Sequence, residues 1–305
     1  MEELLEQILA DCRPYTEQGA VATYIPELAK QDPSALGIYV LCSDGSHYSA
    51  GDYLKPFTIQ SVMKPVLLLL ALMDNGIDGI RHYVGVEATG KPFDAINVSD
   101  TSLLASNLNP MVNAGAIMLC QLLKGANYEE RFTRLLELIR QLADNPDIDL
   151  DMDVYHSEKS TGSKNRALAY LLKSHHMIWD DVEDVLDCYF KACSIRVCSR
   201  DLARIGFVLA NHGRKPKSDE RFFPAEYARF VNACLTTCGM YDGSGDFAIR
   251  VGIPAKSGVG GGIMGVVPTQ MGIGIYGPSL DEKGSSLAGI RALEEFSHQM
   301  YLSIF

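Results

Sequence analysis

The sequence predicts an α+β protein whose antiparallel sheet is built from both ends of the chain, with a helical region inserted between them. Strand-like runs bounded by turn residues occupy residues 36–50 and 247–277. Between residues 61 and 238, apolar side chains recur instead at helical spacing. Strands on both sides of a long helical block are typical of the α+β class.

The whole chain, residues 1–305, is expected to form a single catalytic unit. Residues 1–60 and 240–305 should supply the sheet and the terminal helices, and residues 61–239 should be mostly helical. No internal repeat divides the chain. We expect a small-molecule cleft where the two regions meet, because such junctions commonly hold ligands.

The first elements are a helix and a hairpin. Residues 1–13 place acidic and apolar side chains at helical spacing, which predicts an amphipathic helix. Residues 36–42 and 47–50 are predicted as strands, and the Asp44-Gly45 pair between them is typical of a tight hairpin turn.

The middle of the chain is predicted as helices separated by glycine, proline and asparagine. The first, from Ser61 to about Met73, is apolar on every side, which indicates a helix in the middle of a domain. The polar stretch 155–167 is interpreted as a loop before a helix. Further helices are expected at 102–124, 128–143, 164–177, 180–193, 199–212 and 224–238, then strands at 247–252, 262–268 and 271–277, and a last helix at 285–302.

Composition and charge narrow the functional classes. The chain is 47% hydrophobic and 21% charged, as in ordinary globular proteins, and its formal net charge is −11. Without a basic run, neither nucleic acid nor an anionic membrane is expected as a partner. The apolar runs are far shorter than the ~20 residues that span a bilayer. The acidic start Met1-Glu2-Glu3 does not resemble a secretory signal, so we expect a cytoplasmic protein.

Eight cysteines are spread through the chain, so a disulfide framework is not expected in a reducing compartment. Neither the pair Cys188 and Cys193 nor the pair Cys234 and Cys238 has zinc-ligand spacing. We interpret these residues as small core side chains and expect no metal and no cofactor.

The most informative pair is Ser61 and Lys64, at the start of the apolar helix. Residues three apart share one helical face, so the hydroxyl and the amine can approach each other. Free N–H groups at a helix start suit an oxyanion that forms beside a nucleophilic serine. Burial would lower the lysine pKa and let it act as a base. The alternative is an ordinary N-cap serine.

Five more side chains are candidates for the site. Asn113 and Asn165 carry amides that suit a substrate carboxylate, while Glu158 suits an ammonium group. The alternatives are a helix cap for Asn113 and a solvated loop for the other two. Tyr189 could be a core residue. Tyr241 lies in a glycine-rich turn, where its hydroxyl can relay a proton.

The segment Lys256-Ser257-Gly258 is the last motif. It does not fit a phosphate-binding loop, because the lysine and serine precede the glycines and strand-like sequence follows. On an edge strand, its backbone N–H groups could align an acyl substrate. Ser-x-x-Lys followed by Lys-Ser-Gly resembles the Ser-x-x-Lys and Lys-Thr-Gly motifs of β-lactamases and penicillin-binding proteins.

Over nearly its whole length the chain resembles the serine-dependent glutaminases. The motifs that carry the resemblance are Tyr24-Ile25-Pro26-x-Leu28-Ala29, Gln60-Ser61-x-x-Lys64, Val112-Asn113-Ala114-Gly115-Ala116, Glu158-x-x-Thr161-x-x-x-Asn165-Arg166-Ala167, Tyr189, Gly239-x-Tyr241-Asp242-x-Ser244-Gly245-Asp246 and Lys256-Ser257-Gly258-Val259-Gly260-Gly261-Gly262. One departure is Met63, where the family usually has a small residue, often serine. Because Ser61 and Lys64 are intact, we expect Met63 to affect packing and rate rather than the reaction.

The resemblance implies a β-lactamase-like fold and hydrolysis of L-glutamine to L-glutamate and ammonia, without a cofactor. It implies that Lys64 activates Ser61, and that the backbone N–H groups of Ser61 and Val259 hold the oxyanion. Tyr241 or Lys64 would protonate the departing ammonia. The residues implied in substrate binding are Tyr24, Gln60, Asn113, Glu158, Asn165, Tyr189 and Val259. The resemblance also implies a homo-oligomer, a dimer or a tetramer.

Two alternatives remain open on the sequence. One is another acyl-serine enzyme of the same fold, such as a D,D-peptidase or a β-lactamase, which covalent labelling by a penicillin would favour. The other is an amino-acid sensor without catalysis, which stoichiometric binding without turnover would favour. Fold alone does not decide among them, because one fold hosts many functions.

Overall fold

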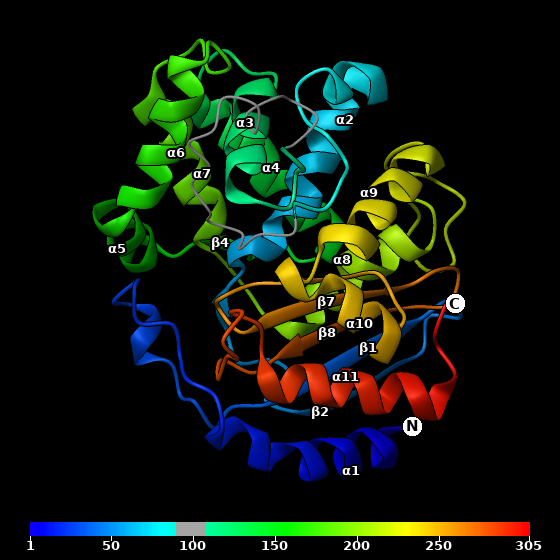
Figure 1. Ribbon diagram of the computed structural model, residues 1–305. Coiled ribbons are helices and arrows are strands. Elements are labelled where there is room, and N and C mark those ends of the chain that lie inside the picture. The colour runs from blue at the N-terminus through cyan, green and yellow to red at the C-terminus, as the bar shows by residue number, and fades with distance from the viewer. Residues whose placement is uncertain (90–107) are drawn as a thin grey trace.

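The computed structural model describes residues 1–89 and 108–305, and its main sheet is built from both ends of the chain (Figure 1). Within the described residues this sheet has five antiparallel strands in the order β2-β1-β8-β7-β6. They are β1 (Gly37–Cys42), β2 (His47–Gly51), β6 (Ala255–Ser257), β7 (Gly262–Val267) and β8 (Met271–Tyr276). The predicted hairpin, the last two predicted strands and the edge position of the Lys-Ser-Gly segment are confirmed.

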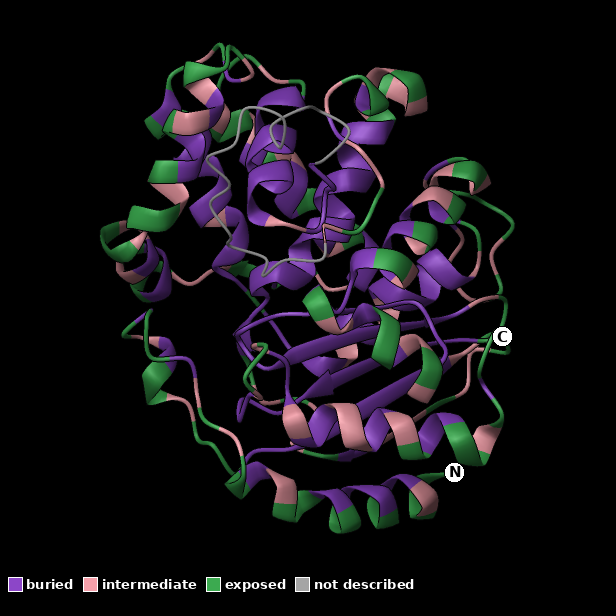
Figure 2. Ribbon diagram, in the orientation of Figure 1, coloured by how far each residue is buried: buried purple, intermediate pink, exposed green. Residues whose placement is uncertain are grey.

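Helices cover both faces of this sheet. On one face lie α1 (Glu2–Cys12) and α11 (Leu287–Met300), whose buried sides face the strands (Figures 1 and 2). On the other face lies α8 (Ser199–Ala210). Two glycines of β8 allow α8 to approach closely, because a Cβ at Gly272 or Gly274 would stand within 2.0 Å of a backbone oxygen of α8.

The helical region is packed around α2 (Lys64–Arg81), whose residues 64–72 are buried as predicted. Ser61 lies just before it, in a 3-10 turn over Gln60–Met63. The helix continues past the predicted end, with a break at Gly76 (φ 72°). The other helices are α3 (Asn113–Leu122), α4 (Tyr128–Ala143), α5 (Met152–Thr161), α6 (Ser163–Ser174), α7 (Val182–Cys193), α9 (Ala225–Cys238) and α10 (Ser244–Arg250). Residues 102–107 of the predicted helix 102–124 lie outside the described residues.

A second, small sheet was not predicted. It consists of β3 (Phe57–Thr58), β5 (Ile195–Val197) and β4 (Asp149–Leu150), in that order. Strands of two or three residues are too short to show a period in the sequence. This sheet ties the segment before Ser61 to the segment after α7, and the N–H of Ile59 donates to the carbonyl of Ile195 at 2.8 Å.

The prediction of a loop at 155–167 is wrong, because helices α5 and α6 occupy this stretch. Asp151 caps α5 by accepting a hydrogen bond from the N–H of Val154 at 3.0 Å. Val154, Tyr155 and Glu158 then face inward on one side of the helix. The polar residues between them lie toward solvent, and their number made the segment resemble a loop.

The predicted strand at 247–252 is also wrong, because most of this segment forms α10. Phe247 and Val251 are buried one helical turn apart, while Ile249 is 87% exposed. Arg250 and Asp246 form an ion pair at 3.2 Å, also one turn apart. Helical spacing therefore overrides the strand propensity of these residues.

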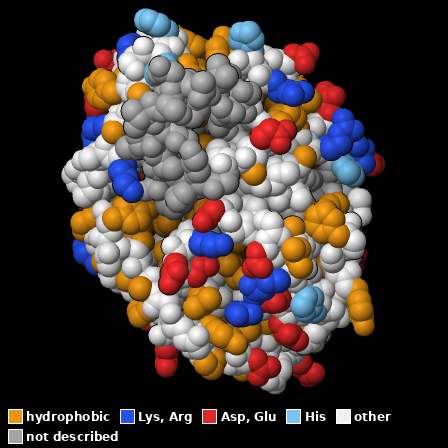
Figure 3. All heavy atoms as spheres, viewed as in Figure 1, with side chains coloured by type: hydrophobic (Ala, Val, Ile, Leu, Met, Phe, Trp, Pro, Cys, Tyr) orange, Lys and Arg blue, Asp and Glu red, His pale blue; other side chains and the backbone are white. Residues whose placement is uncertain are grey.

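Charged side chains of both signs are interspersed on the surface. Over the described part of the face in Figure 3, acidic and basic groups alternate without a continuous basic patch. Within residues 1–89 and 108–305, no helix is both long and apolar enough to cross a membrane.

Met63 lies in the main apolar core and has no exposed surface. We expect Met63→Ser to lower the free energy of unfolding by about 2–4 kcal/mol, since it leaves a cavity and buries a hydroxyl. Met63→Leu conserves volume and should lower it by less than about 1.5 kcal/mol. Urea denaturation measures both values. A serine variant as stable as the native chain would contradict this packing role.

Candidate active site

A pocket of about 320 Å³ lies between the sheet region and the helical region, as expected. It contains eight of the ten predicted site residues: Tyr24, Gln60, Ser61, Asn113, Glu158, Asn165, Tyr189 and Val259. Its other lining residues are Ile25, Thr161, Gly162, Ser163, Lys164 and Cys193. The remaining two predicted residues contact lining residues, Lys64 through Asn113 and Tyr241 through Ser61. Such a volume suits a small metabolite.

Ser61 is presented to the pocket by a strained turn. Gln60, the preceding residue, has a φ of 48°, in the left-handed region that non-glycine residues rarely adopt. Strain of this kind persists where the surroundings enforce it, and it is common at active sites. The glycine-rich turn after β6 lies against Ser61, because a Cβ at Gly258 would stand 3.3 Å from the Ser61 nitrogen. This contact brings Val259, the next residue, to the pocket wall.

Lys64 is completely buried and is held by the walls of the pocket. Its Nζ donates to Asn113 Oδ1 at 2.7 Å and to the carbonyl of Met111 at 3.2 Å. Asn113 Nδ2 donates in turn to Asn165 Oδ1 at 2.9 Å. This chain of hydrogen bonds joins α2, α3 and α6 and fixes the lysine one helical turn after Ser61.

Tyr241 is a buried residue beside Ser61. Burial raises the pKa of its hydroxyl, although contacts with the hydroxyls of Ser61 and Ser257 oppose the rise. Its φ of 56° is also left-handed. A phenol with a raised pKa stays protonated at neutral pH, so this group can donate a proton or a hydrogen bond near Ser61.

Glu158 supplies a carboxyl group deep in the pocket. Burial raises its pKa to about 8, while contacts with Gln60 and Cys193 and the charge of Lys64 oppose the rise. Gln60 Nε2 lies 3.4 Å from Glu158 Oε2. A buried carboxylate gains most from a cationic partner, so this group is chemically suited to an ammonium group.

Comparison with known proteins decides the family. The family model described as Glutaminase matches residues 19–305. The chain belongs to the glutaminase family. It is 50% identical to the glutaminase of Clostridium tetani and to Glutaminase 2 of Clostridium perfringens, each over 305 residues and 100% of both chains.

Solved glutaminase structures share the fold. A Bacillus subtilis glutaminase in covalent complex with 5-oxo-L-norleucine, formed from 6-diazo-5-oxo-L-norleucine, is 37% identical. The TM-score is 0.91, and the match covers 100% of this chain and 99% of that one. The predicted family and the predicted α+β, β-lactamase-like fold are confirmed.

Two residues in or near this glutaminase pocket, Cys193 and Lys256, were not among the predicted site residues. Cys193, interpreted as core, is buried but also lines the pocket beside Glu158. Lys256 is buried, its Nζ lies 4.2 Å from the ring centre of Tyr241, and it donates to the carbonyl of Ser257 at 2.7 Å. Burial, then the charge of Lys64, hold the pKa of Lys256 well below its usual range. The Lys-Ser-Gly motif could have indicated a site role for Lys256, whereas no pattern in the sequence indicated one for Cys193.

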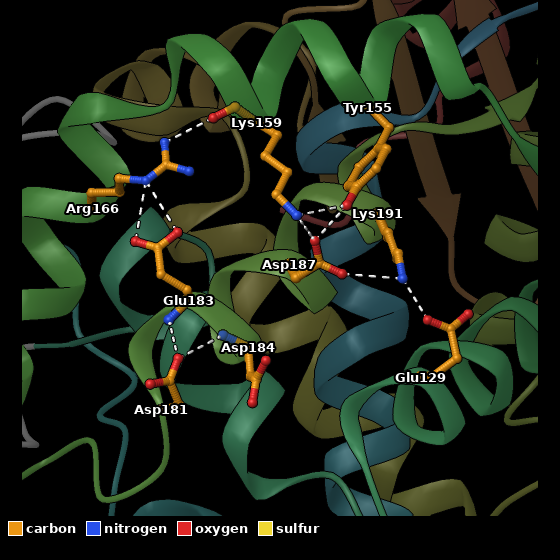
Figure 4. A network of polar contacts seen from close by, with 9 residues as sticks. All are labelled: Glu129, Tyr155, Lys159, Arg166, Asp181, Glu183, Asp184, Asp187 and Lys191. Atoms are coloured by element: carbon orange, nitrogen blue, oxygen red, sulfur yellow. Dashed lines mark hydrogen bonds and ion pairs between the residues drawn. The ribbon is translucent and has the colours of Figure 1, made fainter.

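A network of polar contacts joins α5, which carries Glu158, to α7, which carries Tyr189 (Figure 4). Asp187 of α7 accepts hydrogen bonds from the hydroxyl of Tyr155 and from Lys159, both on α5. Lys191 lies 3.1 Å from the same carboxylate and also pairs with Glu129 of α4. Asp187 therefore docks α5, which carries Glu158, against α7, which carries Tyr189.

We expect Asp187→Asn to raise KM for the amino-acid substrate about tenfold and to leave kcat nearly unchanged, because small misplacements weaken binding. Steady-state kinetics separate the two constants. Asp181→Ala is the matched control, since Asp181 only caps α7 through the N–H groups of Glu183 and Asp184. It should lower stability by about 1 kcal/mol and leave KM unchanged. Equal KM values in both variants would contradict the docking role.

Within the described residues, no group of three or more His, Cys, Asp or Glu side chains is arranged to hold a metal ion. All eight cysteines lie in the described ranges and are free thiols.

Proposed function

We propose that this chain hydrolyses L-glutamine to L-glutamate and ammonia through an acyl-enzyme on Ser61. The observation that carries the proposal is one pocket that contains both a serine on a strained turn and a buried carboxyl, Glu158. A nucleophile and an ammonium partner in one pocket suit a small α-amino acid with a reactive side chain. The covalent glutamine analogue in the Bacillus subtilis relative supports this substrate class.

In the proposed mechanism Lys64 removes the proton of the Ser61 hydroxyl, and Oγ attacks the side-chain amide carbon of glutamine. The backbone N–H groups of Ser61 and Val259 stabilise the oxyanion. Tyr241 or Lys64 protonates the amide nitrogen, and ammonia leaves. Water then attacks the ester carbon, the same groups accept and return its proton, and glutamate is released with Ser61 restored.

The α-amino and α-carboxyl groups are proposed to bind at the other end of the pocket. Glu158 pairs with the ammonium group, and Gln60 orients its carboxylate. The side-chain amides of Asn113 and Asn165 bind the α-carboxylate of the substrate without adding charge to the pocket. The lining side chains Tyr24 and Tyr189 complete this subsite.

Incubation with 6-diazo-5-oxo-L-norleucine tests the proposal together with an ammonia-release assay. We expect turnover of L-glutamine, and a one-to-one adduct located on Ser61 by peptide mass spectrometry. An adduct on another residue would overturn the role of Ser61. Glutamine binding without ammonia release would favour the sensor, and acylation by a penicillin without glutaminase activity would favour a β-lactamase or D,D-peptidase.

The pH dependence of kcat/KM should report Glu158. Its pKa of about 8 in the free protein means that the carboxylate is the minor form at neutral pH. Because the ammonium group needs the carboxylate, kcat/KM should rise by up to about tenfold per pH unit below pH 8 and level off above it. A profile that is flat from pH 6 to pH 9 would contradict this assignment.

We also propose that residues 1–305 act as one catalytic unit in a cytoplasmic homo-oligomer, a dimer or a tetramer. One pocket uses Tyr24 and Val259, from opposite ends of the chain, which supports a single unit. Eight free thiols are compatible with a reducing compartment. Light scattering on the purified protein measures the oligomeric state, and a monomer would contradict that part of the proposal.

A further inference from the structure

A larger cavity, of about 520 Å³, lies on the α8 side of the sheet and contains none of the proposed active-site residues. Its floor is the β1-β2 hairpin, where Tyr39 pairs with Ser49 and Leu41 pairs with His47, so all four side chains share one face. Helix α8 packs mainly on β8 and β7. The β1-β2 edge of the sheet is therefore less covered by α8, and the cavity lies there.

The walls carry positive charge. Arg200, Arg204 and Val208 follow one another at intervals of four residues along α8, and therefore lie on one face of the helix. The facing wall comes from the end of α4 and the segment after α8, with Leu142, Asp144, Lys215 and Pro216. Gly45, Tyr53, Leu54 and the exposed Glu2 complete the lining.

Within the described residues, neither arginine donates a hydrogen bond to a carboxylate. Arg204 Nη1 donates only to backbone carbonyls, those of Ala143 and Asp144, at 3.0 Å each. The Nε of Arg200 is buried without a hydrogen bond, and it forms only a long ion pair with the carboxylate of Asp201, at 4.0 Å. By contrast, Lys215 and Asp144 neutralise each other at 2.6 Å. Each guanidinium group therefore keeps N–H donors that can bind an anion.

Aromatic rings lie beside these arginines. Tyr39 and His47 stack with ring centres 5.6 Å apart and an angle of 11°, and Tyr53 lies 5.7 Å from Tyr39. Flat rings of this kind favour stacking with another planar group. Guanidinium groups bind phosphate or carboxylate through paired hydrogen bonds.

We propose that this cavity is a second ligand site, for a small anion that carries a planar ring, of the size and chemistry of a nucleoside monophosphate. Its phosphate binds Arg200 and Arg204, and its ring packs against the Tyr39, His47 and Tyr53 group. A volume of about 520 Å³ is within the usual range for such ligands.

Isothermal titration calorimetry with adenosine monophosphate tests the site. We expect one-to-one binding to the native protein, weakened at least about tenfold by Arg200→Gln and by Arg204→Gln, because each removes a charged hydrogen-bond donor. Arg229→Gln, at an exposed arginine of α9, is the matched control and should bind normally. Ser61→Ala should also bind normally, which separates this site from the proposed active site.

Adenosine and inorganic phosphate test the two halves of the ligand, and each should bind at least about tenfold more weakly than the nucleotide. Arg204→Gln removes hydrogen bonds at the end of α4, so it is used only if circular dichroism shows a native fold. Arg200→Gln removes no hydrogen bond and only the 4.0 Å ion pair with Asp201, so it keeps the test decisive. Absence of binding at millimolar nucleotide, or equal binding by Arg200→Gln, overturns the proposal. Phosphate binding as tight as the nucleotide overturns the role of the rings.

Discussion

Replacing Ser61 by alanine is expected to lower kcat for L-glutamine hydrolysis by about 10⁴-fold or more, the usual loss when a nucleophile is removed from a coupled catalytic group. Without Oγ no acyl-enzyme can form, and only positioning and oxyanion stabilisation remain. Glutamine should still bind, because Glu158 and the amide groups are unchanged. Ammonia release measures kcat, and calorimetry measures binding.

Ser160→Ala is the control for this loss. Ser160 is exposed at the end of α5 and donates only to the carbonyl of Ser157, so turnover should stay at the native level. Thermal denaturation should show that Ser61→Ala keeps the native fold. If Ser61→Ala turns over glutamine as fast as the control, Ser61 is not the nucleophile.

The parts of the site that the sequence predicted are those carried by short local patterns. Ser61 and Lys64 are three residues apart, a spacing that puts both side chains on one helical face. Gln60 and Glu158, by contrast, are 98 residues apart in the sequence. The small β3-β5-β4 sheet joins the segment before Gln60 to the segment before α5, which carries Glu158. Hydrophobic periodicity cannot predict which short strands pair with one another. Only the family resemblance therefore placed Gln60 and Glu158 in the same site.

The errors have a common cause, which is that tertiary contacts decide local structure. Residues 152–161 are polar, yet α5 forms because Asp187 holds Tyr155 and Lys159 from another helix. Ile249 has high strand propensity, yet it lies exposed on α10 because Phe247 and Val251 find the core at helical spacing. Cys193 likewise belongs to the core and to the pocket wall at once, and composition cannot show the second role.

Replacing Glu158 by glutamine is expected to lower kcat/KM for L-glutamine by about 10²–10³-fold, mostly through KM. The substrate ammonium group would then enter a buried site without a negative partner. Glu226→Gln, at an exposed position of α9, is the matched control and should leave both constants unchanged. Glutaramate, which is glutamine without its α-amino group, tests the contact directly. Its kcat/KM should be similar in the native protein and in Glu158→Gln.

The same substitution should have the opposite effect on stability, and the sign follows from the pKa. Glu158 titrates at about 8 in the folded chain and near its ordinary value of 4.5 when unfolded. Between these values the folded state holds a proton that the unfolded state has lost, so the native free energy of unfolding falls as pH rises toward 8. Glutamine cannot ionise, so above pH 8 Glu158→Gln should be more stable than the native chain by an amount on the order of a few kcal/mol.

Urea denaturation at pH 5 and pH 9 measures this difference, which should be small at pH 5 and large at pH 9. A variant that loses substrate binding and stability together at pH 9 would mean that Glu158 supports the fold, whereas weaker binding with greater stability means that the carboxylate is kept in the pocket for the substrate.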